Sequence, residues 1–396
     1  MAYRILSLDG GGSWALIQVR ALIELYGKDK PGNEILRDFD MVAANSGGSL
    51  VLGGLVENLA LSQLLQYFED ESKRKAIFSP SRSFGDRALH ELTGLGPKYS
   101  SDAKLSALQR LLPRCGDLKL AAVAEGMRRD GAEKDVHLLI IGFDYDRNRA
   151  TFFRSARAGG PQWGVGDPTT VTLAEAIHAS TNAPVNYFDG PASFPDRPER
   201  YWDGGVTGCN NPVLAAVTEA IVSGQGPSNI VVLSVGTATV SLPQRPAGAP
   251  DSPYWRVATD PGLASDLRKL ATAILDDPPD AATFLAHVMT GGSAALAEVD
   301  LKSRVVRLNP LISPIKDPKN EWGAPSGMTA AQFKYLVGLD MDAVEQHEVD
   351  QIAAFTDLWV HNKAMNQPIR MEADTLTLEL GYDRFADAID AWQKLR

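Results

Sequence analysis

The segment Phe39–Leu50 reads FDMVAANSGGSL and joins a short apolar run to a serine that lies between small residues. The apolar run has the length and composition of a buried β-strand. A helix-forming apolar run follows the serine almost at once. This order predicts a strand, a tight turn and a helix, which is the layout of a nucleophile elbow that exposes a serine hydroxyl above a sheet. Ser46 is therefore the first candidate nucleophile.

The residues around this serine nearly match the usual elbow pattern G-x-S-x-G. The chain has Ala44-Asn45-Ser46-Gly47-Gly48, with alanine in place of the first glycine. Small residues are needed on both sides of the serine because the strand and helix backbones nearly touch there. Ser/Gly-rich turns without a catalytic role are also common after strands. This segment alone leaves both interpretations open.

Length and composition indicate a folded globular protein. The 396 residues suffice for one large α/β domain or two ordinary ones, and 44% hydrophobic with 22% charged residues is typical of a substantial core. The longest apolar window, residues 49–65, is interrupted by Glu57 and Asn58. We therefore expect no membrane-spanning helix in this window.

Cysteine content and net charge constrain the compartment and the partners. Two cysteines, Cys115 and Cys209, predict neither a disulfide framework nor a metal cluster. The apolar run at residues 5–8 is too short for a secretion signal, so we expect a reducing cytoplasm. The net charge of −10 argues against general nucleic-acid binding and against bulk attraction to anionic membranes.

A glycine run follows the first predicted strand. Residues 3–8 are mostly apolar and lead into Asp9-Gly10-Gly11-Gly12-Ser13, before a helical pattern over 14–26. The run fits the loose dinucleotide fingerprint, but that fingerprint needs an acidic residue at the end of the second strand, where the chain has Asn45-Ser46. An oxyanion hole donated by the three glycines near Ser46 is the other functional interpretation. A connector that binds no ligand is the third.

The remaining pattern alternates between strands and helices, which predicts a parallel α/β sandwich. Charged residues, including a basic cluster, and interleaved aromatics at 69–97 predict either a solvated face or a lipid-facing lip. Proline- and glycine-rich stretches at 241–261 and 309–328 predict long surface loops. Further strands are expected at 136–143, 150–154, 229–235 and 304–308, and helices at 50–68, 101–112, 172–180, 213–223 and 329–362.

A serine nucleophile needs a base, and the histidines are poor candidates. His137 lies inside a predicted strand, and the other five (His90, His178, His287, His347 and His361) lie in or beside predicted helices. Asp203 follows Tyr201-Trp202 at a predicted strand end and precedes Gly204-Gly205, although Asp-Gly-Gly is also an ordinary turn. A serine–aspartate dyad would let the carboxylate take the hydroxyl proton directly. The sequence contains no zinc-binding spacing.

Three ordered motifs resemble the patatin-like phospholipases. They are Leu6-Ser7-Leu8-Asp9-Gly10-Gly11-Gly12, Asn45-Ser46-Gly47-Gly48 and Asp203-Gly204-Gly205. Further similar segments, in family order within residues 3–310, are Phe78-Ser79-Pro80, Pro97-Lys98-Tyr99-Ser100, residues 179–188 (ASTNAPVNYF) and Arg307-Leu308-Asn309. Motifs that recur in order are far more specific than any one of them.

The resemblance implies a three-layer α/β/α fold and a lipid acyl hydrolase of the phospholipase A type. By position, Ser46 would be the nucleophile, Asp203 the general base and Gly10, Gly11 and Gly12 the oxyanion hole. Glycerophospholipid esters would be cleaved through an acyl-enzyme, without a metal or a cofactor. Two positions depart from the family pattern: Trp14-Ala15 stands where Arg or Lys and then Gly are common, and Ala44 replaces a glycine.

The resemblance also yields expectations about domains and partners. We expect a catalytic domain over 1–310 and a helical extension over 311–396 packed on it. Some bacterial relatives are antiphage effectors activated by cyclic nucleotides, so the expected partners are membrane phospholipids reached transiently, a cyclic-nucleotide activator and a second copy of the chain. The loop at 241–261 is the expected place for an activator or oligomer contact. The rival interpretations are a hydrolase of soluble esters or thioesters and a catalytically silent lipid-binding module.

Overall fold

The computed structural model describes residues 2–77, 98–124, 127, 135–155, 170–184, 187–195, 197–257, 260–262, 269, 280–292 and 303–396. Most of the expected lipid-facing lip, including Phe78, Arg82, Phe84 and Arg87, lies outside these residues.

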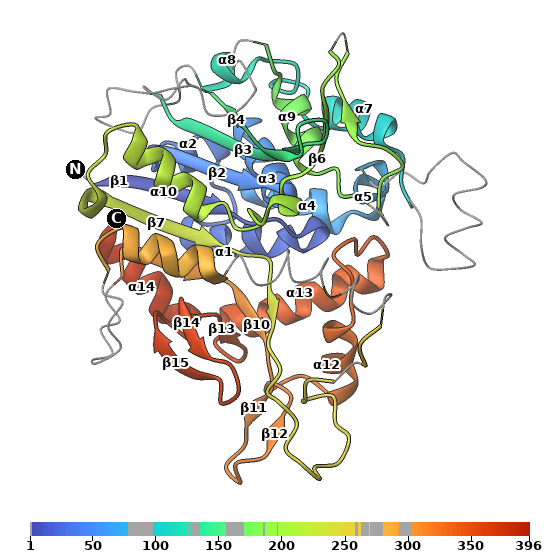
Figure 1. Ribbon diagram of the computed structural model, residues 1–396, viewed down its shortest axis with the longest axis vertical. Coiled ribbons are helices and arrows are strands. Elements are labelled where there is room, and N and C mark those ends of the chain that lie inside the picture. Colours follow the sequence, from blue (N-terminus) through green and yellow to red (C-terminus); the bar gives the residue numbers. More distant parts are fainter. Residues whose placement is uncertain are drawn as a thin grey trace.

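A mainly parallel sheet forms the centre of the molecule, as the sequence predicts (Figure 1). The strand order is β5-β6-β3-β2-β1-β7-β9, and β4 pairs with β3. Five strands run parallel: β1 (Tyr3–Leu8), β2 (Met41–Asn45), β3 (His137–Asp144), β7 (Ile230–Val235) and β9 (Val305–Leu308). Three pair antiparallel at one edge: β4 (Arg149–Arg154), β5 (Ala192–Ser193) and β6 (Arg200–Asp203).

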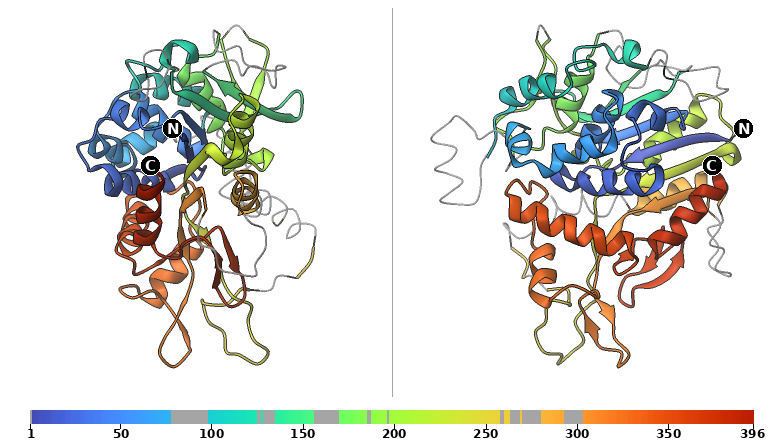
Figure 2. Two further views of the ribbon diagram at one scale, coloured as in Figure 1. Left: turned by 90° about the vertical axis from the view of Figure 1, so that its left-hand side faces the viewer. Right: turned by 180° about the vertical axis from the view of Figure 1, so that it is seen from behind.

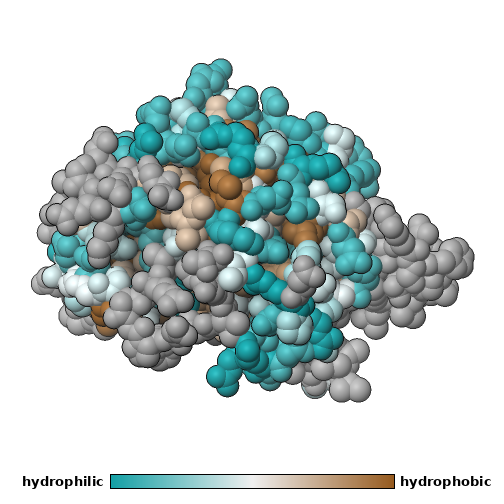
Figure 3. Space-filling view, turned by 90° about the horizontal axis from the view of Figure 1, so that it is seen from above, coloured by the Kyte–Doolittle hydropathy of each residue, from teal (hydrophilic) through white to brown (hydrophobic). Residues whose placement is uncertain are grey.

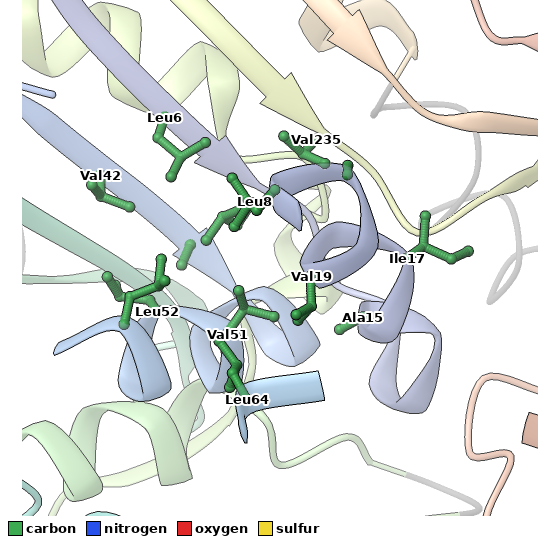
Figure 4. Packing of buried hydrophobic residues seen from close by; sticks show 14 of the residues in the cluster. Leu6, Leu8, Ala15, Ile17, Val19, Val42, Val51, Leu52, Leu64 and Val235 are labelled. Carbon is green, nitrogen blue, oxygen red and sulfur yellow. The ribbon is translucent and has the colours of Figure 1, made fainter. Parts of the chain in front are cut away.

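Helices cover both faces of this sheet, which confirms the expected sandwich (Figure 2). Successive side chains of a strand point to opposite faces, so Leu6 and Leu8 of β1 pack in one core and Ile5 packs in the other. The first core contains residues of α1 (Leu16–Tyr26), α3 (Ser46–Val56) and α4 (Leu61–Glu69) (Figure 4). The second contains residues of α10 (Val213–Val222) and of the helical residues 280–289.

Other elements frame this core. They are η1 (Gly12–Ala15), α2 (Gly32–Leu36), α5 (Glu71–Ile77), α7 (Ser101–Leu111), α8 (Leu120–Ala124), α9 (Leu173–Ser180), η2 (Gly204–Thr207) and η3 (Pro227–Asn229). The first predicted helix thus begins as a 3-10 turn at the third glycine before it continues as α1.

Three sequence predictions need correction. The helix expected at 50–68 is two helices, because Asn58 takes a left-handed φ of 65° between α3 and α4. The helix expected at 329–362 is divided into α12 (Ala330–Val337) and α13 (Gln346–Val360) by a turn after Gly338. The loop expected at 309–328 contains β10 (Pro310–Ile312), β11 (Ile315–Lys316) and β12 (Trp322–Gly323), which are too short to show a period.

The C-terminal segment packs against the sheet domain. β10 pairs with β8 (Thr239–Val240) and with β13 (Met365–Asn366), so pairing continues across residue 310. After the hairpin of β14 (Arg370–Glu372) and β15 (Thr377–Leu380), α14 (Phe385–Leu395) ends the chain. Its Trp392 is fully buried and stacks on Phe39 with ring centroids 5.9 Å apart. The division at residue 310 remains a prediction.

The outer surface is largely hydrophilic on the face drawn in Figure 3, where hydrophobic side chains form small groups between polar ones. None of the helices in the described part of the chain is long and apolar enough to cross a membrane.

Because Trp392 fills the junction between α14 and the sheet domain, Trp392→Ala should lower the free energy of unfolding by about 3 to 5 kcal/mol. Urea unfolding followed by circular dichroism measures this loss. Trp322→Ala, at the half-buried β12, is the matched control and should cost less. An unchanged urea midpoint for Trp392→Ala would contradict the packing described here.

Candidate active site

Ser46 lies at a strained junction between β2 and α3. Its φ is 45°, in the left-handed region that non-glycine residues seldom adopt. The α3 backbone passes so close to the end of β1 that a Cβ on Gly48 would lie 2.4 Å from the Leu8 carbonyl oxygen. Ala44 is fully buried in β2, and its methyl group fits this packing. The backbone N–H of Ser46 donates to Ser180 Oγ at 2.9 Å.

The sheet brings Asp203 to Ser46. Asn45 of β2 pairs with Ile141 of β3, and Asp203 of β6 pairs with the next residue, Gly142, from the other side. Ser46, which follows β2, and Asp203, which ends β6, are therefore brought together beside β3. The Ser46 hydroxyl therefore lies near the Asp203 carboxylate and lowers its pKa.

Further hydrogen bonds fix the Asp203 carboxylate and its backbone. The Gly205 N–H donates to Oδ1 at 2.8 Å, and η2 begins at Gly204 directly after the aspartate. The Asn45 amide group lies 3.3 Å from the same oxygen. The Asp203 N–H donates to the Asn182 carbonyl at 2.9 Å.

The environment of Asp203 makes its carboxylate a stronger base than an exposed one. The side chain is buried, and this burial raises its pKa above the usual range. The nearby Ser46 hydroxyl, the hydrogen bond from the Gly205 N–H and the charge of Lys104 each lower the pKa in part. A carboxylate with a raised pKa accepts a proton more readily at neutral pH.

The glycine run lies directly beside the Ser46 turn. A Cβ on Gly47 would lie 2.8 Å from the Gly12 backbone nitrogen, so the two turns are in contact. The Gly10 N–H donates to the Asn210 carbonyl at 2.8 Å. Within the described residues, the N–H groups of Gly11 and Gly12 form no hydrogen bond. These two donors are therefore available beside the serine.

A buried ion pair holds the start of this glycine loop. Asp9 Oδ2 lies 2.6 Å from Arg307 Nη2, and each side chain is 4% exposed. Burial raises the pKa of Asp9 to about 6, and Arg307 opposes this rise. Arg307 also donates to Ser234 Oγ at 2.8 Å. The pair thus ties the end of β1 to β7 and β9.

Residues 340–342, here called the strap, cross the outer side of the glycine loop. The Met341 carbonyl accepts from the Ser13 N–H at 3.2 Å, and Trp14 Nε1 donates to the Asp340 carbonyl at 3.0 Å. Trp14, the residue that departs from the family pattern, is thus a strap contact. Sequence patterns cannot show this contact because the partners are more than 300 residues apart.

The other end of the strap is anchored by side chains. Asp342 is buried, and its Oδ2 accepts from Tyr99 Oη at 2.7 Å and from Lys98 Nζ at 3.0 Å. Tyr187 Oη donates to Asp340 Oδ1 at 2.6 Å. The strap therefore joins the C-terminal segment to the chain before α7 and after α9.

A narrow apolar hollow opens beside Ser46. The space not occupied by protein atoms, open solvent at its mouth included, is about 390 Å³, and the walls include Leu50, Ile77, Phe188 and the strap residue Met341. A second hollow of about 340 Å³ shares Leu50 and Ile77 and continues between α3, α4 and α7. The two hollows place apolar surface next to the serine hydroxyl.

Among the described residues, no histidine forms a hydrogen bond with Ser46. His178 is buried in α9, and its Nδ1 has no hydrogen-bond partner. His287 is buried and contacts Ser303 Oγ at 2.8 Å. No cluster of three or more His, Cys, Asp or Glu residues suited to a metal ion occurs among the described residues.

Two polar residues near Asp203 did not emerge as site residues from the sequence. Lys104 and Asn182 are both fully buried, and Lys104 Nζ donates to Asn182 Oδ1 at 2.8 Å. Asn182 lies in a segment with a family resemblance, but its role was not evident. Lys104 shares the inner face of α7 with Ala107 and Leu108. A lysine at such core-facing helical spacing is the signal that could have identified it.

Comparisons with known proteins agree on one family. The family model described as patatin-like phospholipase matches residues 6–217. A cGAMP-activated phospholipase from Pseudomonas aeruginosa is 27% identical over 263 residues, which cover 64% of this chain and 68% of that protein. An intracellular phospholipase A2 from Caenorhabditis elegans is 26% identical over 218 residues, 54% of this chain. This match spans only 16% of the nematode protein.

Among solved structures, VipD from Legionella pneumophila aligns over 90% of this chain and 67% of its own, with 12% identity and a TM-score of 0.36.

Removing one partner of the buried Asp9–Arg307 pair should destabilise the fold. Arg307→Met leaves the Asp9 carboxylate without its counter-charge, and such losses cost about 3 to 5 kcal/mol. Without the guanidinium, the pKa of Asp9 rises further, so protonation relieves the penalty at low pH. The loss of unfolding free energy should therefore be larger at pH 8 than at pH 5. Urea unfolding at both values measures it.

The control is Arg370→Met, which removes an exposed partner of Glu379 and should have little effect at either pH. A pH-independent loss for Arg307→Met would show that only packing was removed.

Proposed function

Because the chain belongs to the patatin-like phospholipase family, a family of lipid ester hydrolases, we propose that it cleaves ester bonds of membrane glycerophospholipids. The observation that carries the proposal is the strand register that brings the buried Asp203 carboxylate to Ser46, beside the N–H groups of Gly11 and Gly12, which have no partner among the described residues. This arrangement supplies a nucleophile, a base and oxyanion donors at one point.

In the proposed reaction, Ser46 Oγ attacks the ester carbonyl carbon while Asp203 takes the hydroxyl proton. The oxyanion that forms receives hydrogen bonds from the N–H groups of Gly11 and Gly12. Asp203 then returns the proton to the leaving alcohol, which departs as a lysophospholipid. Water attacks the acyl-enzyme while Asp203 accepts a proton from it, and Asp203 then returns this proton to Ser46 Oγ as the fatty acid is released.

The apolar hollow supports an acyl substrate. Its walls at Leu50, Ile77 and Phe188 lie beside Ser46, and the adjoining hollow extends the apolar surface along Leu108 and Leu112. Burying an alkyl chain there gains about 0.8 kcal/mol per methylene group. We propose that the chain reaches its lipid transiently as a peripheral protein.

Ser46→Ala and Asp203→Asn should each lower turnover of phospholipid vesicles by about 10³-fold or more, because each removes one member of a dyad that acts as a unit. Fatty-acid release from mixed phospholipid vesicles, followed by mass spectrometry, measures the loss. Matched controls are Ser62→Ala in α4 and Asp146→Asn in the β3–β4 turn, which should retain parental rates. Parental turnover in Ser46→Ala would refute the serine mechanism.

The same experiment separates the rival functions. Cleavage of short soluble esters without cleavage of vesicles would favour an esterase or thioesterase. Absence of fluorophosphonate labelling at Ser46, with lipid still bound, would favour a silent lipid-binding module. Parental turnover in Asp203→Asn would assign the base role to another residue.

We also propose that a cyclic nucleotide controls this activity, as part of an antiphage response. The support is the similarity, over 64% of this chain, to a protein described as a cGAMP-activated phospholipase. A panel of cyclic mono- and dinucleotides should contain at least one that raises vesicle hydrolysis by about tenfold or more, which corresponds to about 1.4 kcal/mol of coupling. Light scattering in the same samples tests whether activation accompanies self-association. Equal rates across the panel would contradict nucleotide control.

A further inference from the structure

Lys104 is a fully buried lysine that the proposed chemistry does not use. It lies on α7 with no exposed surface, and burial lowers its pKa well below the ordinary value. Lysine is almost never fully buried unless it is paired, because removing an ammonium ion from water is costly. Its position therefore requires specific compensation from its neighbours.

Three groups supply that compensation. Lys104 Nζ donates to Asn182 Oδ1 at 2.8 Å and lies 3.9 Å from the centroid of the Phe188 ring, over its face. The charge of Asp203 raises the pKa of Lys104, and Lys104 in turn lowers the pKa of Asp203. Lys104 is a charged side chain that lowers the pKa of Asp203.

The same lysine also contacts the backbone support of Asp203. The side-chain oxygen of Asn182 accepts a hydrogen bond from the Lys104 ammonium group, and its backbone carbonyl oxygen accepts one from the Asp203 N–H. Its side-chain oxygen also accepts from Ser101 Oγ at 3.2 Å, and its Nδ2 donates to the Gly190 carbonyl at 2.6 Å. A single residue, Asn182, thus connects the lysine to the position of the aspartate.

We infer that Lys104 is a positioning residue for the dyad: its ammonium group keeps the Asp203 carboxylate ionised and holds Asn182 against the Asp203 backbone. This role rests on the proposed function of Asp203 as the base. A base must be ionised before it can accept the Ser46 proton, and burial alone favours the protonated carboxyl.

Other titratable groups near the pair do not replace the lysine. His178 of α9 faces Lys104, and burial followed by the lysine charge lowers its pKa, so it stays neutral. Tyr187 faces Asp203, and burial raises the pKa of its phenol, which remains protonated. The opposite charge for Asp203 in the described part of the site therefore comes from α7.

Three substitutions separate the charge of Lys104 from its hydrogen bond. Lys104→Met removes both, Lys104→Gln keeps a donor for Asn182 without charge, and Lys104→Arg keeps both. The readout is the pH dependence of kcat/KM on phospholipid vesicles, whose acid limb reports the ionisation of the free enzyme's base. Lys30→Met, which removes an exposed partner of Glu34, is the control.

We expect the acid limb to move to higher pH by about one unit or more in both Lys104→Met and Lys104→Gln, because an opposite charge has been lost. Lys104→Arg and Lys30→Met should keep the parental limb. An unmoved limb in Lys104→Gln, whatever the maximal rate, would overturn the electrostatic role. A purely structural lysine would lower the rate or the melting temperature without moving the limb.

A second measurement does not depend on turnover. In protein labelled with ¹³C at the aspartate carboxyl carbon, Asp203→Asn identifies the Asp203 resonance, and its titration should move upward by the same amount in Lys104→Gln. If the parent hydrolyses no lipid but the titration moves, the proposed function fails and the inferred charge interaction stands. If the parent is active and the titration does not move, only the role of Lys104 fails. If Lys104→Met does not fold, Lys104→Gln still tests the loss of the lysine charge.

Discussion

The close approach of the α3 backbone to the ends of β1 and β2 is the constraint on which the site depends. Gly48 lies against the Leu8 carbonyl, and Gly47 lies against Gly12, with no room for a side chain at either position. This contact forces Ser46 into its left-handed φ and sets the glycine loop beside it. Helix α3 and the glycine loop could not approach each other this closely with larger residues. The small residues of both motifs therefore meet the same steric requirement.

A second constraint is the burial of charge. Asp9 and Arg307 form a buried ion pair, and Asp203 and Lys104 are buried and connected through Asn182. A buried charge is costly alone, and Arg307 of β9 supplies the counter-charge for Asp9 at the end of β1. The ion pair fixes the loop whose Gly11 and Gly12 N–H groups have no partner among the described residues. In its inferred role, Lys104 acts instead on the Asp203 carboxylate, so the two buried cations have different consequences for the site.

Much of the arrangement follows from local patterns. The apolar runs of β1, β2, β3 and β7 have the length of buried strands. The glycine run and the serine turn each follow a parallel strand, and the carboxyl ends of parallel strands lie at the same edge of a sheet. The placement of Asp203 beside Ser46 could not follow from local pattern alone. Asp203 reaches this position because β6 pairs antiparallel with β3, and no local pattern shows which strand β6 will join. The contacts of Lys104 and Trp14 depend on tertiary packing, which leaves no periodic pattern in the local sequence. The strands from 310 to 323 were missed because two or three residues show no alternation.

The strap gives the C-terminal segment a direct part in the site. Met341 borders the hollow beside Ser46, and its carbonyl group accepts a hydrogen bond from the Ser13 N–H, next to Gly11 and Gly12. Tyr99 and Lys98 hold Asp342 from the opposite side. The family match at 6–217 contains Ser46 and Asp203, yet a wall of the hollow comes from residue 341. The shape of the hollow therefore depends on residues beyond the family match, and a fragment that ended at 310 would contain Ser46 and Asp203 but lack this wall.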